Sequence, residues 1–287
     1  MSHARERLLL ATTRGLEGVL RDEAAHLGAA RVTDEGVFLE GPLGLHRRAN
    51  LELRTANRVW LLQKPKIDTS GELLYRRGFR QEVSRAPLRE TIAAGILLLA
   101  GYAPETPLWD PLCGSGTLLI EAALLARNLA PGLSRSFAFE SFADHNPEAF
   151  ARQKAAYAAR ARPKAPALIL GTDLNAGALG TARRNAQRAG VFADLALERQ
   201  DATVPRKGLP PGTLAIANLP YGIRVGETAA LPKLYAALVA ALRQSGVARV
   251  ALLARDPRAP EWLGLPNATL HPMDNGGLSC RLICSPL

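Results

Sequence analysis

The hydrophobic pattern of the first part of the chain predicts a small α+β unit. Short apolar runs occupy residues 8–13 and 36–41. Between them, residues 15–28 carry apolar side chains at helical spacing, at Leu16, Val19, Leu20 and Leu27. A longer mixed run follows at 43–62. Because strand-like and helix-like runs occur here without regular alternation, we expect a compact unit that resembles neither a bundle nor an all-β domain.

From Leu88 onward the apolar runs alternate regularly between strand length and helix length. Strands are predicted at 106–110, 166–173, 193–201, 212–218 and 248–255, and helices at 88–102, 116–130, 175–190 and 230–246. This alternation indicates an α/β fold, with a mostly parallel, doubly wound sheet covered by helices on both faces. Two further alternating runs, 268–273 and 278–285, are separated by "DNGG" and predict a closing antiparallel hairpin.

The segment between these regions lacks helical periodicity and contains Pro65, Gly71, Gly78 and Pro87, so it predicts a linker or a short hairpin. The expected domains are therefore 1–63, 64–87 and 88–287. A second irregular stretch, 136–164, lengthens the first crossover of the sheet. Within it, residues 147–162 predict an extra helix with a basic face, which either lines the substrate cleft or only packs, and His145 is expected at the surface.

Composition narrows the class of protein. Hydrophobic residues make up 47% of the 287-residue chain, yet no apolar run reaches the length of about 18 residues that a membrane helix needs. The first residues do not resemble a signal peptide, so we expect a cytoplasmic protein. The three cysteines, Cys113, Cys280 and Cys284, are too few and too irregularly spaced for a disulfide framework or a zinc site, and no metal is expected.

The formal net charge of +10 favours an anionic partner such as nucleic acid, although a biased genome composition would produce the same excess of arginine. Arginines and two aromatic residues are interleaved in the segment 75–89, a mixture suited to phosphate contacts and base stacking. The alternative is a solvated linker. The residues expected to contact RNA are Arg76, Arg77, Arg80, Arg85 and Arg224.

A glycine-rich turn between a strand and a helix, "DPLCGSGTLL", predicts a small-molecule site. Gly114 and Gly116 let a ligand approach the backbone closely, and the following helix offers free N–H groups. A Walker lysine is missing, and Leu119 stands where a dinucleotide fingerprint has its third glycine. Asp110 would repel a pyrophosphate, whereas it suits the ammonium and sulfonium groups of S-adenosylmethionine.

Polar residues end four successive predicted strands: Asp110, Asp173, Asp201 and Asn218. In an open parallel sheet these positions lie along one carboxyl edge, where ligands bind. Asp173 suits the two ribose hydroxyls and Asp201 the adenine amine, although any single aspartate here could instead cap a helix. The residues expected to bind the cofactor are Asp110, Cys113, Gly114, Ser115, Gly116, Thr117, Asp173, Leu174, Asp201, Ala202 and Asn218.

The sequence "NLPY" after the last of these strands suits the methylation of an amine on a base. Such an amine is a poor nucleophile, because its lone pair is delocalised into the ring. The side-chain oxygen of Asn218 and the carbonyl of Leu219, held by Pro220, could accept its two hydrogens, while Tyr221 stacks on the base. The alternative is an ordinary turn after a strand. Asn218, Leu219, Pro220 and Tyr221 are the expected catalytic residues.

Residues 88–284 resemble the THUMP-associated RNA guanine-N2 methyltransferases through "DPLCGSGTLLIEAA", "GTDLNAGALGTARRNAQRAG", "NLPYG" and "NGGLSCRL". The N-terminal part resembles the ferredoxin-like unit of the bacterial 23S rRNA member. The resemblance implies a Rossmann-like class I methyltransferase fold, with cofactor held by Asp173 and Asp201 and guanine received at Asn218, Pro220 and Tyr221. Two departures stand out: Leu219 replaces a proline common in the family, and only "KPK" stands where most of the THUMP module would be.

With this resemblance, the sequence predicts an S-adenosylmethionine-dependent RNA methyltransferase, and the resemblance implies the N2 amine of a guanine in 23S rRNA as its target. Four alternatives stay open: the same reaction on tRNA, N-methylation of a protein glutamine, N-methylation of a DNA adenine, and a non-catalytic RNA-binding assembly factor. A nicotinamide-dependent oxidoreductase fits the glycine turn less well.

Overall fold

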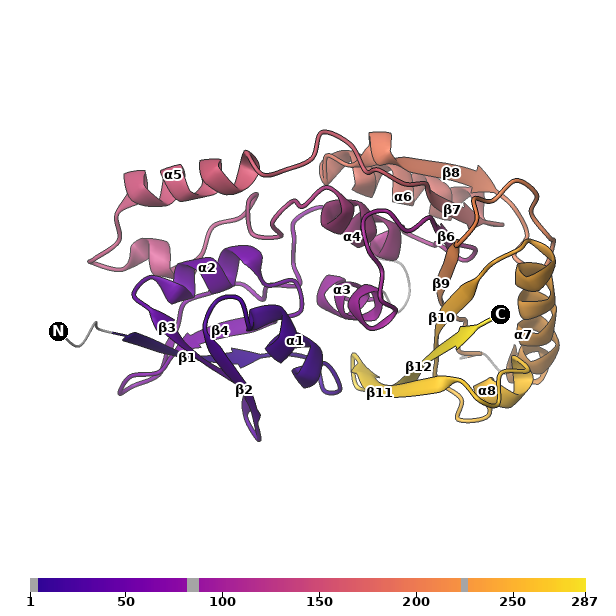
Figure 1. Ribbon diagram of the computed structural model, residues 1–287, viewed down its shortest axis with the longest axis horizontal. Coiled ribbons are helices and arrows are strands. Elements are labelled where there is room, and N and C mark those ends of the chain that lie inside the picture. The colour runs from indigo at the N-terminus through magenta and orange to yellow at the C-terminus, as the bar shows by residue number, and fades with distance from the viewer. Residues whose placement is uncertain (1–4, 82–87, 223–226) are drawn as a thin grey trace.

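The computed structural model describes residues 5–81, 88–222 and 227–287, and these form a small and a large unit, each built on its own sheet (Figure 1). The small unit contains β1 (Arg5–Ala11), α1 (Glu17–Ala24), β2 (Ala29–Thr33), β3 (Gly36–Pro42), α2 (Leu45–Glu52), β4 (Arg58–Leu61) and β5 (Ile67–Asp68). Its strands pair in the order β2-β3-β1-β4-β5, and all the pairs are antiparallel. The expected α+β unit is confirmed.

The core of the small unit follows the strand and helix periods of its sequence. In β1, Leu8 and Leu10 are fully buried while their neighbours are not, as the two-residue period of a strand requires. In α1, Leu20 and Ala24 are buried one helical turn apart. The short strand β5 pairs with β4, so the beginning of the segment 64–87 forms the hairpin that the sequence allowed.

The large unit has a seven-stranded sheet in the order β11-β12-β10-β9-β6-β7-β8. The strands β6 (Leu108–Asp110), β7 (Ile169–Asp173), β8 (Leu195–Arg199), β9 (Leu214–Asn218) and β10 (Arg249–Ala254) are parallel. The strands β11 (Thr269–Asn275) and β12 (Leu278–Pro286) form the predicted hairpin, and β12 pairs antiparallel with β10. The expected doubly wound sheet with its closing hairpin is confirmed.

Helices cover both faces of this sheet (Figure 1). One face packs against α3 (Glu90–Leu99), α4 (Thr117–Ala126) and α6 (Ala176–Arg188), and the other against α7 (Glu227–Gln244) and α8 (Ala259–Trp262). Successive strand residues point to opposite faces: Leu108 and Ile216 belong to the first core, and Trp109 and Ala217 to the second. Burial on both faces explains why these strands are almost continuously apolar.

The insertion in the first crossover packs on the small unit. It contains η1 (Ala138–Ser141) and α5 (Pro147–Ala158), which lie on the side of the small unit where α2 is found (Figure 1). Phe137, Phe139 and Phe150 join the core of the small unit, with their rings in mutual contact. The insertion therefore packs rather than lining the carboxyl edge of the sheet. His145 is half-buried against Phe139 and Phe150, not at the surface as expected.

The small unit also touches the large unit beside the closing hairpin. A Cβ on Gly15 would lie 2.1 Å from the carbonyl oxygen of Pro272, so only glycine allows the loop before α1 to approach β11 this closely. The backbone N–H of Asp274 donates to the carbonyl of Arg14 at 3.0 Å. Because contacts cross between the units here and at the insertion, the domain boundaries expected from sequence stay a prediction.

Candidate active site

Three polar side chains end neighbouring strands at the carboxyl edge of the large sheet. Asn218 ends β9, Asp110 ends β6 and Asp173 ends β7, and these strands are adjacent in that order. Asp201 lies beyond the next strand, because β8 ends at Arg199 and not at Asp201 as expected. The structure thus brings three of the four predicted strand ends together on consecutive strands and places Asp201 in the loop that follows the fourth.

The glycine turn between β6 and α4 is closed on one side and open on the other. Gly114 and Gly116 both adopt left-handed backbone, with φ of 51° and 82°. A Cβ on Gly116 would lie 3.0 Å from the Cβ of Ala182 in α6, whereas no described residue lies within 4 Å of the Cβ position of Gly114. Among the residues that the structure describes, no side chain caps α4. Its first N–H groups can therefore serve a negatively charged ligand group above the turn.

Asp110 is a buried acid, and no residue in the described part of the chain gives it a positive partner. Its side chain accepts a hydrogen bond from the backbone N–H of Leu112 at 3.0 Å, and the residue is 1% exposed. Burial raises the pKa of Asp110 to about 8, and the nearby charge of Asp173 acts in the same direction. No basic residue among those described contributes to this pKa. A cationic ligand group would favour the ionised form and offset the cost of burying it.

Asp173 is held in place by its neighbours in the turn. Its two oxygens accept from the N–H of Gly114 at 2.9 Å and of Asn175 at 2.8 Å. The next side chain, Leu174, is 58% exposed, an unusual degree for a large apolar residue. A fixed carboxylate beside an exposed apolar surface suits a nucleoside, whose sugar has hydroxyls and whose base has an apolar face.

The remaining residues expected at the cofactor give weaker support for a cofactor site. Asp201 is exposed and accepts from the N–H of Thr203 at 2.8 Å, a bond that lowers the pKa of Asp201. Ala202 and Thr117 are buried, and Ser115 is half-buried in the turn. Burial raises the pKa of Cys113 well above its usual range, so its thiol stays protonated and is not a nucleophile.

The loop after β9 is held by the sheet and by α7. The N–H of Leu219 donates to the carbonyl of Leu253 at 2.9 Å, and Leu219 is 1% exposed. The carbonyl of Pro220 accepts from the hydroxyl of Tyr235 at 2.8 Å. These bonds fix the backbone on both sides of the Leu219 carbonyl. The sequence did not indicate Tyr235, because it lies within an apolar helix whose pattern predicts only packing.

Tyr221 differs from its expected role as a free stacking surface. Its hydroxyl donates to the side-chain oxygen of Asn218 at 2.7 Å and accepts from the side-chain amide of Asn275 at 3.0 Å. The thiol of Cys280 lies 3.6 Å from the same hydroxyl. The ring is half-buried against the core, so Tyr221 orients Asn218 in this structure. Asn275 and Cys280 come from the hairpin, and sequence reasoning predicted that hairpin without giving either residue a role at the site.

The arginines expected to contact RNA fall into three groups. Arg77 and Arg80 are poorly exposed for that role, because their side chains are 4% and 11% exposed and form ion pairs with Glu121 and Glu90, so RNA contact by either stays a prediction. Phosphate contact by either would break such a pair. Arg76 is 61% exposed and its partner, Glu72, is equally accessible. Arg85 and Arg224 lie outside the described residues.

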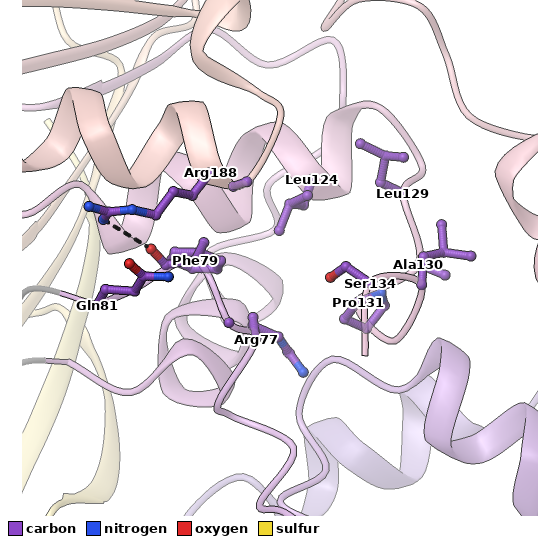
Figure 2. Close-up of a pocket in the computed structure, with 12 residues that line it drawn as sticks. Arg77, Phe79, Gln81, Leu124, Leu129, Ala130, Pro131, Ser134 and Arg188 are labelled. Atoms are coloured by element: carbon purple, nitrogen blue, oxygen red, sulfur yellow. Dashed lines mark hydrogen bonds between the residues drawn. The ribbon is translucent and has the colours of Figure 1, made fainter. Parts of the chain in front are cut away.

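The structure also contains a cavity of about 480 Å³, whose lining residues are drawn in Figure 2. It is lined by Leu124 near the end of α4, by Arg188 at the end of α6 and by Phe79. Arg188 donates to the carbonyl of Phe79 at 3.5 Å, the bond drawn in Figure 2. Because the carboxyl edge lies at the opposite ends of these helices, the cavity is not part of the candidate active site.

Two searches of the described residues returned nothing. No group of three or more His, Cys, Asp or Glu residues is arranged to hold a metal ion within the ranges 5–81, 88–222 and 227–287. In the same ranges, no helix has both the length and the apolar character needed to cross a membrane.

Comparison with known proteins identifies relatives for both units. Residues 77–282 match the family described as "RMKL-like, methyltransferase domain", and residues 7–60 match the "RlmL ferredoxin-like domain". The chain is 37% identical to a ribosomal RNA large subunit methyltransferase K/L of Chromohalobacter salexigens over 234 residues, which cover 77% of this chain and 32% of the relative.

Two further similarities extend over more of the chain. The methyltransferase K/L of Vibrio parahaemolyticus is 37% identical over 266 residues, 88% of this chain and 38% of the relative. The chain thus spans about a third of the length of these curated relatives. A crystal structure of SMU.472 complexed with SAH matches with a TM-score of 0.90 and 22% identity, and the match covers 98% of this chain and 97% of that one.

Proposed function

This chain belongs to the family of RMKL-like methyltransferase domains, and from that premise we propose that it transfers a methyl group from S-adenosylmethionine to the exocyclic N2 amine of a guanine in RNA. The observation that carries this proposal is the pairing of two features on one sheet edge. A buried, uncompensated acid at Asp110 suits a cationic cofactor, and an oriented carboxamide at Asn218 on the adjacent strand suits an amine.

The residues present fit S-adenosylmethionine. Asp110 would meet the positive charge of the cofactor, and the N–H groups at the start of α4 would receive its carboxylate. Asp173 is fixed where it can accept from the ribose hydroxyls, and Leu174 offers an apolar surface to the adenine. When bound, the cofactor supplies an electrophilic methyl group on a sulfonium. A protein with the same fold has been crystallised with SAH, which agrees with this assignment.

The protein has to make a weak nucleophile reactive. The side-chain oxygen of Asn218 accepts one hydrogen of the guanine amine, and the carbonyl of Leu219 accepts the other. Both acceptors draw the nitrogen toward a tetrahedral geometry in which its lone pair points at the methyl group. No strong base is needed, because holding the reactants in place contributes on the order of 7–11 kcal/mol to such a reaction. After transfer the nitrogen carries a positive charge, and it loses one proton to water, which suffices as the acceptor because a protonated amine on a base is strongly acidic.

The target base must leave its stack to reach this edge, so we expect a single-stranded or looped guanine. We assign the RNA to the 23S class because the curated relatives are named for large-subunit ribosomal RNA. The net charge of +10 supports a polyanionic substrate. Such a protein would act in the cytoplasm. A tRNA substrate offers the same amine to the same site and is the first alternative for the experiment to exclude.

The test is incubation with methyl-labelled cofactor and a mixture of ribosomal RNA, tRNA, DNA and protein, followed by separation of the fractions. We expect label in ribosomal RNA, as N2-methylguanosine, and a strongly reduced rate of labelling when Asn218 is replaced by alanine. Label confined to tRNA would correct the substrate, and label confined to DNA or protein would overturn the proposal. Cofactor binding without transfer to any fraction would instead support an RNA-binding assembly factor.

A further inference from the structure

A chain of hydrogen bonds connects the closing hairpin to the catalytic carboxamide. The side-chain amide of Asn275 donates to the hydroxyl of Tyr221 at 3.0 Å, and that hydroxyl donates to the side-chain oxygen of Asn218 at 2.7 Å. Asn275 is 6% exposed and ends β11, 54 residues further along the chain than Tyr221. The bond therefore joins two separate segments of the fold at the edge where transfer is proposed.

The direction of these bonds has a chemical consequence. A phenol has one proton to donate, and a carboxamide can rotate to present either its oxygen or its nitrogen. Because Asn275 donates to the Tyr221 oxygen, the phenol proton is free to point toward Asn218. A proton arriving there requires an acceptor, so the carboxamide presents its oxygen. The second lone pair of that oxygen remains for the guanine amine, whereas a rotated carboxamide would present N–H groups to another N–H donor.

The hairpin holds Asn275 firmly in position. Asn275 is paired in register with Leu278 across a turn of two left-handed glycines, Gly276 and Gly277. The preceding residue, Asp274, accepts from the N–H of Gly277 at 2.8 Å, and its own N–H donates to the carbonyl of Arg14 in the small unit. Asn275 is thus fixed both by the hairpin and by the contact between the two units.

We propose that Asn275 is a positioning residue for methyl transfer: it sets the direction of the Tyr221 hydroxyl and, through it, presents the Asn218 oxygen to the target amine. This inference rests on the proposed function, because the amine is the group that Asn218 receives. It assigns the hydroxyl of Tyr221 a role separate from that of its ring. It also gives the "NGG" turn a purpose beyond closing the sheet.

Two substitutions at one position distinguish this role from a structural one. Asn275→Ala removes the amide donor to the Tyr221 hydroxyl and leaves the weaker thiol donor of Cys280. We expect kcat to fall about threefold to tenfold, the effect of one lost hydrogen bond. Asn275→Asp keeps the shape but, when ionised at pH 8, can only accept. It should attract the phenol proton away from Asn218, so we expect a larger fall, about tenfold or more. A residue that only packs would show the opposite order, with the same-shaped aspartate the milder change.

The hydroxyl provides a second test. In a Tyr221→Phe background the relay is already broken while the ring remains, so Asn275→Ala and Asn275→Asp should have no further effect on kcat. Non-additivity of this kind is the signature of residues that act as one unit. The exposed Asn267, just before β11, gives the matched control, and Asn267→Ala should leave kcat unchanged. Persistence of the full Asn275 effects in the Phe background would overturn the proposal.

Readouts besides activity keep this test separate from that of the proposed function. The cofactor dissociation constant and KM for RNA should be unchanged in Asn275→Ala, and its melting temperature should fall only by the small amount that one lost buried hydrogen bond costs. The Cζ resonance of Tyr221, one of five tyrosines and identified by its loss in Tyr221→Phe, should shift. An unmoved resonance would show that the bond is absent and overturn the relay, even if the wild type methylates RNA. If the wild type methylates nothing, the proposed function fails, and the resonance alone decides whether the relay exists.

Discussion

The two halves of the candidate active site prepare for their ligands in opposite ways. On the β6 and β7 side, the residues described in the structure provide no cation to the buried Asp110 and leave the space above Gly114 open. On the β9 side, Asn218 is already engaged by Tyr221, which is engaged in turn by Asn275. In the first half, a positively charged ligand group would provide the partner that Asp110 lacks among the described residues. In the second half, hydrogen bonds within the protein already orient Asn218 before any substrate binds.

This difference matches what each half has to do. A cofactor must bind tightly and leave after each turnover, and an unpaired acid supplies attraction that disappears when the positive charge is lost. A target amine must be held in one geometry during transfer, and that demands side chains whose orientation does not depend on the substrate. The comparison therefore predicts that substitutions in one half change cofactor affinity and that substitutions in the other change the rate.

The largest effect is expected from the β9 half. Asn218→Ala removes the oriented acceptor, so we expect kcat to fall about a hundredfold to a thousandfold, as when a positioned catalytic hydrogen bond is deleted. Cofactor affinity should change by no more than about twofold, because Asp110 and the glycine turn are untouched. Single-turnover rates and calorimetric binding on the same preparation check both parts. A loss of affinity equal to the loss of rate would erase the distinction between the halves.

The next largest effect is a pH dependence of cofactor affinity, which we expect from the Asp110 half of the site. The folded protein without cofactor holds a proton on Asp110 up to a pH of about 8, and a bound cation favours the carboxylate. Binding should therefore release a proton below pH 8. Affinity should rise about tenfold per pH unit between pH 6 and 8 and then level off, since one unit of pKa corresponds to about 1.36 kcal/mol. Calorimetry in buffers of different ionisation enthalpy measures the release.

Asp110→Asn should flatten this pH profile and weaken binding above pH 8, because no carboxylate can form. The stability of the free protein should respond with the opposite sign. The raised pKa of Asp110 means that its contribution to stability is full at low pH and is lost as pH rises toward 8. Thermal unfolding without cofactor should show this loss in the wild type and less of it in the variant. A wild-type affinity independent of pH would contradict the assignment of Asp110.

A smaller effect, on stability and cofactor binding, is expected from a substitution in the glycine turn. Gly116→Ala adds a Cβ 3.0 Å from Ala182 at a φ of 82°, so both crowding and backbone strain oppose it. We expect a loss of about 1–2 kcal/mol in stability from the backbone alone, with weaker cofactor binding. Gly190→Ala is the control, because its φ is 70° but nothing lies within 4 Å of its Cβ position. Equal cofactor affinity in the two variants would show that the turn does not form the cofactor site.

The smallest effect is expected on RNA binding, from an arginine outside both halves of the site. Arg76→Ala removes an exposed cation, so we expect RNA binding to weaken by only a few-fold and the salt dependence of binding to fall by about one charge. Arg152→Ala in α5 is a matched control, since Arg152 is also exposed and also pairs with a glutamate four residues away. Filter binding across a salt series checks both. Identical behaviour of the two variants would remove Arg76 from the RNA surface.

Much of the fold could be predicted from local patterns in the sequence. Alternation of apolar runs located the parallel strands and the hairpin, and the polar strand ends at Asp110, Asp173 and Asn218 met at one edge as parallel topology requires. The position of the insertion was not predictable, because Phe137, Phe139 and Phe150 show that something is buried but not where. The burial of Arg77 was hidden for a related reason: its partner Glu121 lies 44 residues away.

The candidate active site, like the fold, could be predicted from sequence only where its signals are contiguous. The glycine turn and "NLPY" are contiguous signals, so their chemistry could be argued from sequence. The bonds from Tyr235 to Pro220 and from Asn275 to Tyr221 depend on tertiary contacts that no sequence spacing encodes. The structure adds a role for the Tyr221 hydroxyl as a hydrogen-bonded link to Asn218, while stacking of its ring on the base stays a prediction. Residues that act through another residue are the ones that sequence patterns miss.

The central claim is that this sheet edge methylates the N2 amine of a guanine, and nucleoside mass spectrometry tests it most directly. Digested ribosomal RNA from cells lacking the gene should have lost one N2-methylguanosine. Expression of the wild-type chain should restore it, and expression of Asn218→Ala should not. An unchanged N2-methylguanosine content, or the loss of a methylated adenine instead, would contradict the account.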